Sequence, residues 1–307
     1  MQHRDIIVIG AGPAGLTAGY YCSFYAFDTL IFEEKIPGGN AAEIAVLENY
    51  PGYSEGITGK DLVDKMVKQC KKAGAEIRQF EKVIELNLKS KKNTVKTEKS
   101  IYSADVIIMA SGRYSRVLGV PGENQFHGKG VSYCAVCDGA FFKEKKVIIV
   151  GEDRRAAEVA IYLSGLASNA KLVCQKEKLC AEKILIEDLE KQKVEILRDM
   201  ELKEIKGDIK VKSVILFNKE TEETKEIDAD GVFFQLEGIP NSQIARKSGV
   251  KVDKDGYIIV DDKGRTNIDG VYAIGDITIS PTKLVVTAMA QAAAAAIDIL
   301  EHINRHL

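Results

Sequence analysis

The chain has 307 residues, 45% of them hydrophobic, with a formal net charge of −2. This length predicts two domains, each with its own core. The near-neutral charge excludes the broad basic surface of a nucleic-acid-binding protein. The longest apolar stretch, residues 284–300, carries Gln291 and Asp298 and is too short and too weakly hydrophobic to predict a membrane span.

The first half of the chain alternates strands and helices. An apolar run at residues 5–9 predicts a parallel strand that is buried on both faces. It begins so early that there is no room for a secretory signal, and six cysteines without such a signal favour a cytoplasmic protein. A helix from residue 13 to about 27, a strand at 29–32, a helix at 58–74 and a strand at 106–110 follow. This order predicts βαβ units and a parallel sheet.

The same order recurs in the second half of the chain. Residues 146–150, 156–168 and 170–174 predict strand, helix and strand, and glycine- and proline-rich segments at 119–122 and 238–241 predict linkers. A last strand at 271–274 and a C-terminal helix return to the first domain. We therefore expect an α/β protein with two Rossmann-like dinucleotide-binding domains, the first discontinuous. It comprises residues 1–116 and 242–307, and the second comprises residues 117–241.

A glycine-rich loop follows the first strand. It contains Gly10, Gly12 and Gly15, with Pro13 and Ala14 between the last two. Gly10 allows a tight turn, Gly12 lets the backbone approach a pyrophosphate, and Gly15 permits close packing of helix and strand. Glu33, at the end of the next strand, can accept hydrogen bonds from ribose hydroxyls, and Glu34 is the competing candidate. The alternative is that the glycines serve a turn alone.

Cys134 and Cys137 are separated by two residues, and Asp138 follows directly. Such a pair can form a small reducible disulfide ring and often holds a thiolate of low pKa. Asp138 can deliver or accept a proton as the disulfide opens. The alternative is half of a zinc site, but no histidine of the four forms a recognisable metal motif with another cysteine, so we expect no metal. The remaining cysteines are expected to be small buried hydrophobic residues: Cys22, Cys70, Cys174 and Cys180.

Six segments together resemble a low-molecular-weight thioredoxin reductase over nearly the full chain. They are residues 10–16, 48–52, 110–112, 119–123, 134–139 and 275–276. The resemblance implies domains of the FAD/NAD-linked reductase type, FAD on the first domain, thioredoxin as electron acceptor and a homodimer. Cys137 would face the flavin, Cys134 would attack the partner disulfide, and Asp138 would be the proton donor.

The resemblance also implies the residues around FAD. Asp276 would bind the ribityl chain, and the helix that begins near Leu284 and Val285 would point its amino end at the flavin. That helix dipole would favour the anionic reduced ring. Further residues expected along the cofactor are Gly38, Gly39, Asn40, Asn49, Ala110, Gly112 and Gly275. Lys283, with Leu284 and Val285, stands where the family usually has Arg-Gln-Ala.

The second nucleotide loop departs from the family pattern. Residues 151–156 are Gly-Glu-Asp-Arg-Arg-Ala where members that use a pyridine nucleotide have Gly-Gly-Gly-Asp-Ser-Ala. Glu152 and Asp153 would place negative charge beside a diphosphate, which costs about 4 kcal/mol for one like charge 4 Å away at an effective dielectric near 20. The family's arginine cluster is replaced at Cys174, Gln175, Lys176 and Cys180. We therefore expect no NADPH, although Arg154, Arg155 or Lys176 offer a different route to a phosphate.

This pattern resembles the ferredoxin-dependent flavin thioredoxin reductases, which lack the NADPH motifs. Reduced ferredoxin is therefore the expected donor, and FAD suits it because a flavin takes single electrons and passes on a pair. Basic residues are expected where the acidic ferredoxin docks. The candidates are Lys143, Lys145, Lys146, Arg154 and Arg155. Three alternatives stay open: an NADPH-dependent thioredoxin reductase with an atypical site, an FAD-dependent small-molecule dithiol oxidase, and a redox sensor without turnover.

Overall fold

The structure is a computed structural model that describes residues 2–44, 46–47, 49–88, 93–114, 116–236 and 238–306. The chain divides into two compact units. Unit 1 comprises Met1–Tyr114 and Ile239–Leu307, and unit 2 comprises Ser115–Gly238. The sequence analysis placed the two boundaries at residues 116/117 and 241/242. Glu48, the first residue of one family-like segment, lies outside the described residues.

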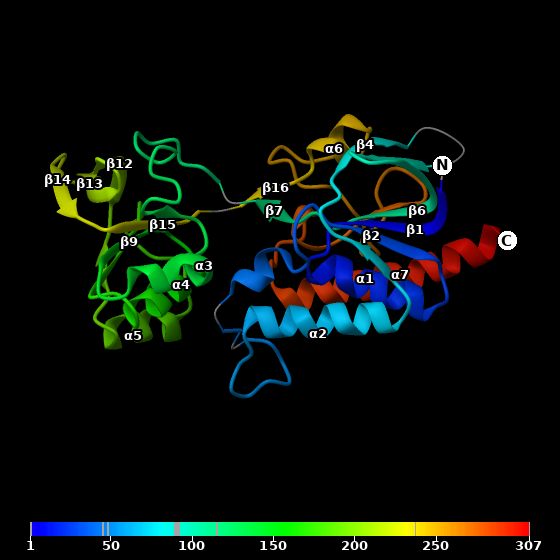
Figure 1. Cartoon of the computed structure of the whole chain (residues 1–307), viewed down its shortest axis with the longest axis horizontal. Coiled ribbons are helices and arrows are strands. Elements are labelled where there is room, and N and C mark those ends of the chain that lie inside the picture. Colours follow the sequence, from blue (N-terminus) through cyan, green and yellow to red (C-terminus); the bar gives the residue numbers. More distant parts are fainter. Residues whose placement is uncertain are drawn as a thin grey trace. The chain divides into compact units, whose positions relative to one another are not determined.

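Unit 1 is built on a mixed sheet in the order β3-β2-β1-β6-β5-β4 (Figure 1). β2 pairs in parallel with β1 and β3, and β6 pairs in parallel with β1 along one side and with β17 near its carboxyl end. β5 and β4 add an antiparallel edge. The strands are β1 (Gln2–Ile9), β2 (Thr29–Phe32), β3 (Glu76–Arg78), β4 (Val83–Asn87), β5 (Asn93–Thr97), β6 (Ile101–Met109) and β17 (Val271–Ala273), and β7 (Arg113–Tyr114) pairs separately with β16 (Ile239–Pro240).

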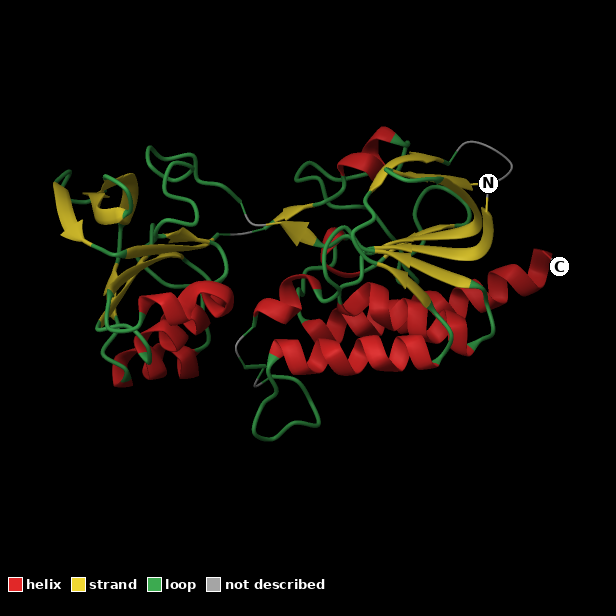
Figure 2. Cartoon of the chain, in the orientation of Figure 1, coloured by secondary structure: helices red, strands yellow, loops and turns green. Residues whose placement is uncertain are grey.

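Helices of unit 1 cover one face of this sheet. Figure 2 shows α1, α2 and α7 side by side beneath the strands, and α1 packs against both of the others. Alternate residues of β1 divide between the two faces: Ile6 and Val8 join the helical core, and Ile7 joins the opposite one. The helical elements of unit 1 are α1 (Pro13–Phe24), η1 (Gly39–Glu43), α2 (Gly59–Lys72), α6 (Gln243–Lys247), η3 (Gly275–Ile277) and α7 (Val285–His306).

The C-terminal helix α7 is 22 residues long. The expectation that this stretch is too short and too weakly hydrophobic to span a membrane was wrong on both counts, because by length and composition alone the helix could cross one. Such a helix is also common in protein cores, and α7 buries Ala292, Ala296 and Ile299 in the core that it shares with α1. Its alanines permit this close approach. These three residues pack one side of α7 against the core of unit 1.

Unit 2 repeats the strand and helix order of unit 1. Its parallel sheet runs β11-β10-β9-β15-β8, with α4 connecting β9 to β10 and α5 connecting β10 to β11. An antiparallel sheet, β12-β13-β14, packs beside it, in a segment where the sequence predicts alternating short strands. The elements are β8 (Val131–Ser132), α3 (Ala135–Asp138), η2 (Gly139–Phe142), β9 (Lys146–Gly151), α4 (Arg154–Ser164), β10 (Asn169–Val173), α5 (Lys183–Lys191), β11 (Glu195–Leu197), β12 (Met200–Gly207), β13 (Val211–Asn218), β14 (Thr224–Asp228) and β15 (Gly231–Gln235).

Candidate active site

Three loops of unit 1 meet where neighbouring parallel strands end. Gly10 follows β1, Ala110 follows β6, and Gly275 follows β17 by one residue. The strand pairing places them together, since Ile9 and Ala273 both lie opposite Met109. Gly10 has a positive φ of 102°, and a Cβ there would lie 2.5 Å from the carbonyl oxygen of Ala110. The carboxyl edge of such a sheet is the usual place for a ligand in α/β proteins.

The glycines after Gly10 have separate structural reasons. A Cβ on Gly15 would lie 1.9 Å from the carbonyl oxygen of Gly10, so the close contact of α1 with the loop requires glycine. A Cβ on Gly12 would meet no described atom within 4 Å. Gly12 is the N-cap of α1 and Pro13 begins the helix, with no side-chain hydrogen bond to the cap. The amino end of α1 is therefore open and carries a positive dipole end, as anion binding requires.

Glu33 is the acidic residue that belongs to this loop. Its carboxylate accepts the backbone N–H groups of Ala11 at 2.8 Å and Lys35 at 2.9 Å. Glu34, the competing candidate, instead pairs with Lys82 at 2.7 Å on the surface. The structure thus favours Glu33 over Glu34 as the residue expected to accept hydrogen bonds from ribose hydroxyls.

Residues 38–40 lie against the same loop. The N–H of Gly38 donates to the carbonyl oxygen of Ala11 at 2.8 Å, and a Cβ on Gly39 would lie 3.4 Å from the Cα of Gly12. The amide of Asn40 donates to the carbonyl oxygen of Arg113 at 3.0 Å, which connects this loop to the segment that contains Gly112. Asn49 lies in an exposed turn of the same unit.

Asp276 takes part in a cluster that the sequence analysis did not foresee. Its carboxylate accepts two hydrogen bonds from Arg113, from Nε at 3.2 Å and Nη2 at 3.1 Å. Burial alone would lower the pKa of Arg113, but Asp276 and Tyr257 outweigh it and raise that pKa. Lys283 donates to the carbonyl oxygen of Asp276 at 3.1 Å and lies over the ring of Tyr257, 4.4 Å from its centroid. Arg113 therefore binds the carboxylate expected to hold a ribityl chain, and Lys283 contacts the main chain of the same residue.

Gln291 connects α7 to this site. Its side-chain oxygen accepts the N–H of Gly275 at 2.7 Å, which explains a polar residue in an otherwise apolar helix. Gly275 has a φ of 75°, and a Cβ on it would lie 2.9 Å from the Cβ of Ala14. Gln291 thus holds the loop after β17 close to the amino end of α1. Leu284 and Val285, at the start of α7, follow that loop along the chain.

In unit 2 a disulfide joins Cys134 and Cys137. Cys134 is the N-cap of α3, and its sulfur accepts the N–H of Cys137 at 3.2 Å. This contact would stabilise a thiolate on Cys134 after reduction, which suits a nucleophile. Cys137 is the more exposed of the two, with Cys134 half-buried. Asp138 is half-buried beside them and accepts a hydrogen bond from the hydroxyl of Ser132 at 2.6 Å.

The second nucleotide loop is closed by its own side chains. The carboxylate of Asp153 accepts the N–H of Ala156 at 3.1 Å and caps α4. Lys176 pairs with Glu152 at 2.7 Å, and Arg154 pairs with two carboxylates, Glu158 at 2.7 Å and Glu182. Arg154 and Lys176, two of the three basic residues that offered another route to a phosphate, are thus engaged by carboxylates of the chain itself.

Of the four other cysteines, three are buried and one is exposed. Cys22, Cys70 and Cys174 are fully buried, which confirms their expected role as small hydrophobic residues. Burial raises the pKa of both Cys22 and Cys70 to about 12, so their thiols stay protonated. Cys180 is exposed, and the expectation was wrong for it. It lies next to the second nucleotide loop, where its backbone forms an isolated parallel β-bridge with that of Asp153.

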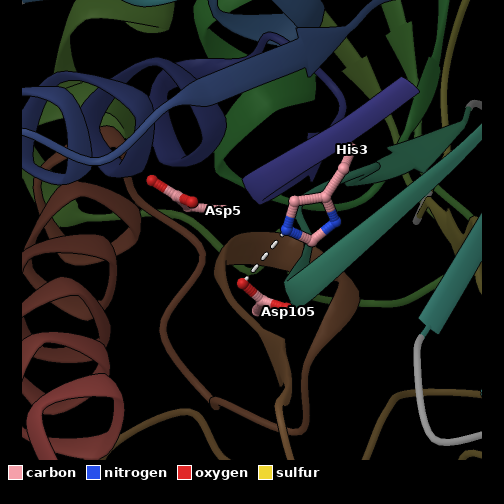
Figure 3. A group of neighbouring side chains, drawn as sticks. All are labelled: His3, Asp5 and Asp105. Atoms are coloured by element: carbon pink, nitrogen blue, oxygen red, sulfur yellow. Dashed lines mark ion pairs between the residues drawn. The ribbon is translucent and has the colours of Figure 1, made fainter. Parts of the chain in front are cut away.

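His3, Asp5 and Asp105 gather at the surface of unit 1, as Figure 3 shows. The ring of His3 has a partner at each nitrogen: Nε2 lies 3.3 Å from Asp105, and Nδ1 lies 3.2 Å from the hydroxyl of Ser103. Asp5 accepts the N–H of Asp28 at 2.8 Å. The contacts therefore account for the three side chains as surface partners of one another and of the chain around them.

Comparisons with known proteins agree with this geometry. The sequence profile of the pyridine nucleotide-disulphide oxidoreductases matches residues 4–292. The chain belongs to this family. The thioredoxin reductase of Bacillus subtilis is 38% identical over 302 residues, which cover 98% of the chain and 95% of that relative. A Clostridium pasteurianum protein described as a 34.2 kDa protein in the rubredoxin operon is 36% identical over 297 residues, with 96% of each covered.

The solved structures give the same result. The thioredoxin reductase of Lactococcus lactis, in its FR conformation, superposes with a TM-score of 0.95 at 34% identity and covers 98% of the chain and 99% of its own. This agreement confirms the predicted fold class, an α/β protein with Rossmann-like dinucleotide-binding domains.

Proposed function

We propose that the chain is a flavoprotein disulfide reductase that reduces thioredoxin through Cys134 and Cys137, with reduced ferredoxin as its electron donor. The observation that carries the first part is the disulfide itself, with Asp138 next to it and an amide directed at the Cys134 sulfur. The family and the names of its relatives support the same reaction.

FAD would lie on unit 1, where the described residues fit it. The open space beside Gly12 leaves room for a pyrophosphate at the amino end of α1, and the Glu33 carboxylate is held in the same loop. Bound FAD can take single electrons and pass on a pair. The residues that would hold it are Gly10, Gly12, Pro13, Ala14, Gly15, Glu33, Gly38, Gly39, Asn40, Asn49, Ala110, Gly112, Gly275, Asp276, Leu284 and Val285.

The choice of donor rests on unit 2. The family is named for pyridine nucleotides, yet the Asp153 carboxylate fills the end of α4 where a diphosphate would need the amides. Arg154 and Lys176 are held by carboxylates at the same loop. A protein that donates single electrons to the flavin would not need the nucleotide loop of unit 2.

Two of the basic residues expected to receive ferredoxin are paired with carboxylates in the structure, and a further basic surface lies on unit 1. Lys146 pairs with Asp228 at 3.0 Å, and Arg154 is paired as described above, so these two candidates are largely neutralised. In unit 1 the exposed face of α2 carries Lys65, Lys68 and Lys72, spaced along one stripe of the helix, and the structure shows no ion pair from them to any described residue. This α2 lysine stripe suits an acidic partner.

The stripe lies on a helix that contacts the proposed FAD loop. A Cβ on Gly38 would lie 3.0 Å from the Cγ1 of Val63, and one on Gly59 would lie 1.9 Å from the carbonyl oxygen of Ala41. An acidic carrier on α2 would therefore dock on the element that packs directly against residues 38–41. This continuity makes α2 our choice of donor surface.

Two exposed aromatic residues bear on the protein partners. Phe141 is 72% exposed and comes four residues after Cys137, where it can contact a protein substrate that approaches the dithiol. Phe24 is 66% exposed and belongs to an aromatic group on α1 with Tyr20 and Tyr25. That group, in which Phe24 is exposed and the two tyrosines are half-buried, is our candidate surface for a homodimer.

In the proposed cycle the disulfide opens, and Cys134 attacks the thioredoxin disulfide to form a mixed disulfide that Cys137 resolves. One dithiol cannot meet the flavin and a protein disulfide at once, so the two exchanges are separate steps of the cycle. Cys137→Ser therefore traps a mixed disulfide between Cys134 and thioredoxin, visible by non-reducing electrophoresis and mass spectrometry.

The matched variant Cys134→Ser separates the two roles. It leaves the exposed Cys137 sulfur alone and should trap no thioredoxin. Trapping through Cys137 in place of Cys134 would reverse the assignment of the two cysteines. Full thioredoxin turnover by Cys137→Ser would contradict the proposed function. Rapid oxygen-dependent oxidation of small dithiols by the wild type, with no thioredoxin turnover, would instead show a dithiol oxidase.

A further inference from the structure

Ser132 lies between the nucleophilic cysteine and the acid. It ends strand β8, is 3% exposed, and pairs in the parallel sheet with Phe233. Its hydroxyl donates to Oδ2 of Asp138 at 2.6 Å and accepts the N–H of Cys134 at 3.1 Å. The carbonyl oxygen of Cys134 lies 3.2 Å from the same hydroxyl. One buried side chain therefore contacts both residues.

The Ser132 hydroxyl has one proton and two possible acceptors, the Asp138 carboxyl group and the Cys134 carbonyl oxygen. The contact with Asp138 is shorter by several tenths of an ångström, so an oxygen of the Asp138 carboxyl group receives the proton and the Cys134 carbonyl oxygen is the weaker acceptor. Because Ser132 is buried at the end of a strand, its position is set by the sheet. The sheet therefore fixes Asp138 through this hydrogen bond.

The backbone of α3 does not fix Asp138 by itself. This helix has only four residues, and its N–H bond from Asp138 to the carbonyl oxygen of Cys134, 3.1 Å long, holds the main chain and leaves the side-chain torsions free. Asp138 is half-buried, so without Ser132 its carboxylate can rotate toward water. No described residue donates a hydrogen bond to Oδ1, which leaves that oxygen to carry the transferable proton.

We propose that Ser132 is a positioning residue that holds the Asp138 carboxyl group ready to protonate the Cys134 sulfur. The inference rests on the proposed function for its reaction. When the S–S bond opens, an electron pair enters at Cys137, which bound FAD would supply, and the bond to Cys134 breaks. Cys134 leaves as a thiolate and takes the proton from Oδ1 of Asp138, and Ser132 donates its hydrogen bond to the carboxylate that results.

The test uses a reaction that requires neither flavin nor thioredoxin. Dithiothreitol attacks the exposed Cys137 sulfur, Cys134 leaves by the same bond cleavage, and dithiothreitol becomes the oxidised partner. The matched variants are Ser132→Thr and Ser132→Val, which have the same shape and differ in the hydroxyl. The measured quantity is the opening rate of each variant divided by that of the wild type, from pH 5 to 9, which cancels the ionisation of dithiothreitol.

We expect Ser132→Thr to open within about twofold of the wild type and Ser132→Val to open about tenfold more slowly, less than the roughly 100-fold loss expected for Asp138→Asn. The deficit of Ser132→Val should vary with pH and disappear in the Asp138→Asn background, since the two residues act together. Equal rates for the threonine and valine variants, or a deficit that is constant with pH and persists without Asp138, overturn the inference.

Thermal melts of both variants test whether they fold. Ser132→Ala provides a smaller residue for the case in which the added methyl group disturbs the site. Thioredoxin reduction is measured separately with the photoreduced holoenzyme. Loss of that activity in every form, the wild type included, contradicts the proposed function, while the dithiothreitol rates still decide the role of Ser132.

Discussion

The carboxylate of Asp153 accepts the N–H of Ala156 at 3.1 Å, so the amino end of α4 already holds an anion of the chain itself. The equivalent end of α1 has Gly12 as its N-cap, with no side-chain hydrogen bond and open space where a Cβ would be. A helix amino end binds an external phosphate only if its amides are free. Two similar strand-loop-helix units in one chain thus differ in their capacity for a dinucleotide.

Gly12 and Gly15 should give opposite phenotypes. Gly12→Ala keeps an extended backbone that alanine adopts readily, with φ of −74°, and meets no described atom, so the apoprotein should keep its stability. FAD affinity should fall about tenfold or more, equivalent to about 1.4 kcal/mol, because the methyl group enters the space proposed for the pyrophosphate. The measurement is FAD binding by fluorescence quenching.

Gly15→Ala is the matched comparison. Its methyl group would lie 1.9 Å from the carbonyl oxygen of Gly10, so the apoprotein should lose about 2 kcal/mol or more of stability in urea unfolding. If Gly12→Ala binds FAD as tightly as the wild type, the cofactor does not use this helix end.

The α2 lysine stripe should control the encounter with the donor. Replacing Lys65, Lys68 and Lys72 by glutamate should raise the KM for reduced ferredoxin about tenfold at low salt, and added salt should shrink the difference. The control is Lys60→Gln, which removes a lysine already paired with Asp64 at 2.8 Å. Reduction of thioredoxin by the photoreduced enzyme should not change. A ferredoxin KM equal to the wild-type value would place the docking surface elsewhere.

Phe141 should affect thioredoxin and leave the flavin unaffected. Phe141→Ala should raise the KM for thioredoxin about tenfold, the loss of an exposed aromatic anchor worth about 1.4 kcal/mol, with an unchanged rate of disulfide opening by dithiothreitol. Phe80→Ala is a comparison, since Phe80 is 62% exposed and belongs to unit 1. Equal effects of the two substitutions would mean that Phe141 has no special contact.

Asp298 should make unit 1 sensitive to acid. Its side chain is 1% exposed. Burial alone would raise its pKa, but hydrogen bonds from Arg265, Tyr272 and Lys263 hold that pKa well below the usual range. A carboxyl group whose pKa is lowered by folding stabilises the folded state at pH values above its unfolded pKa, near 4. This stabilisation is lost as the pH falls toward the folded pKa.

The melting temperature of the wild type should therefore fall more steeply between pH 5 and 3 than that of Asp298→Asn. At pH 7 the asparagine variant should be about 2 kcal/mol less stable, because charge-assisted hydrogen bonds are lost. Parallel melting curves for the two proteins across this pH range would show that the ion cluster contributes nothing.

Much of the fold could be predicted because its signals are local. Apolar runs and glycine loops define β1, α1 and β2 within residues 2–32, and their repetition at β9, α4 and β10 predicted the second unit. The expectation that residues 284–300 cannot span a membrane was wrong because the helix continues beyond that stretch to His306. The antiparallel sheet β12-β13-β14 has a polar outer side and was described only as short alternating strands.

The site was harder to predict where its contacts are distant in sequence. Arg113 and Asp276 are 163 residues apart, and no local pattern connects them. Ser132, by contrast, is within six residues of Asp138, and a serine two positions before a dithiol was a signal that could have been used. The basic residues of the second loop could be counted from sequence, but their pairing with Glu152, Glu158 and Glu182 depends on folding.

The most direct test of the account is the anaerobic visible absorbance of the flavin in the purified holoenzyme. One sample receives excess NADPH and a parallel sample receives enzymatically reduced ferredoxin. We predict that ferredoxin bleaches the flavin within the mixing time of the experiment and that NADPH leaves it oxidised, because Asp153 and the paired Arg154 and Lys176 close the second nucleotide loop. Rapid bleaching by NADPH would contradict the account and make the chain a pyridine-nucleotide-dependent thioredoxin reductase with an atypical site.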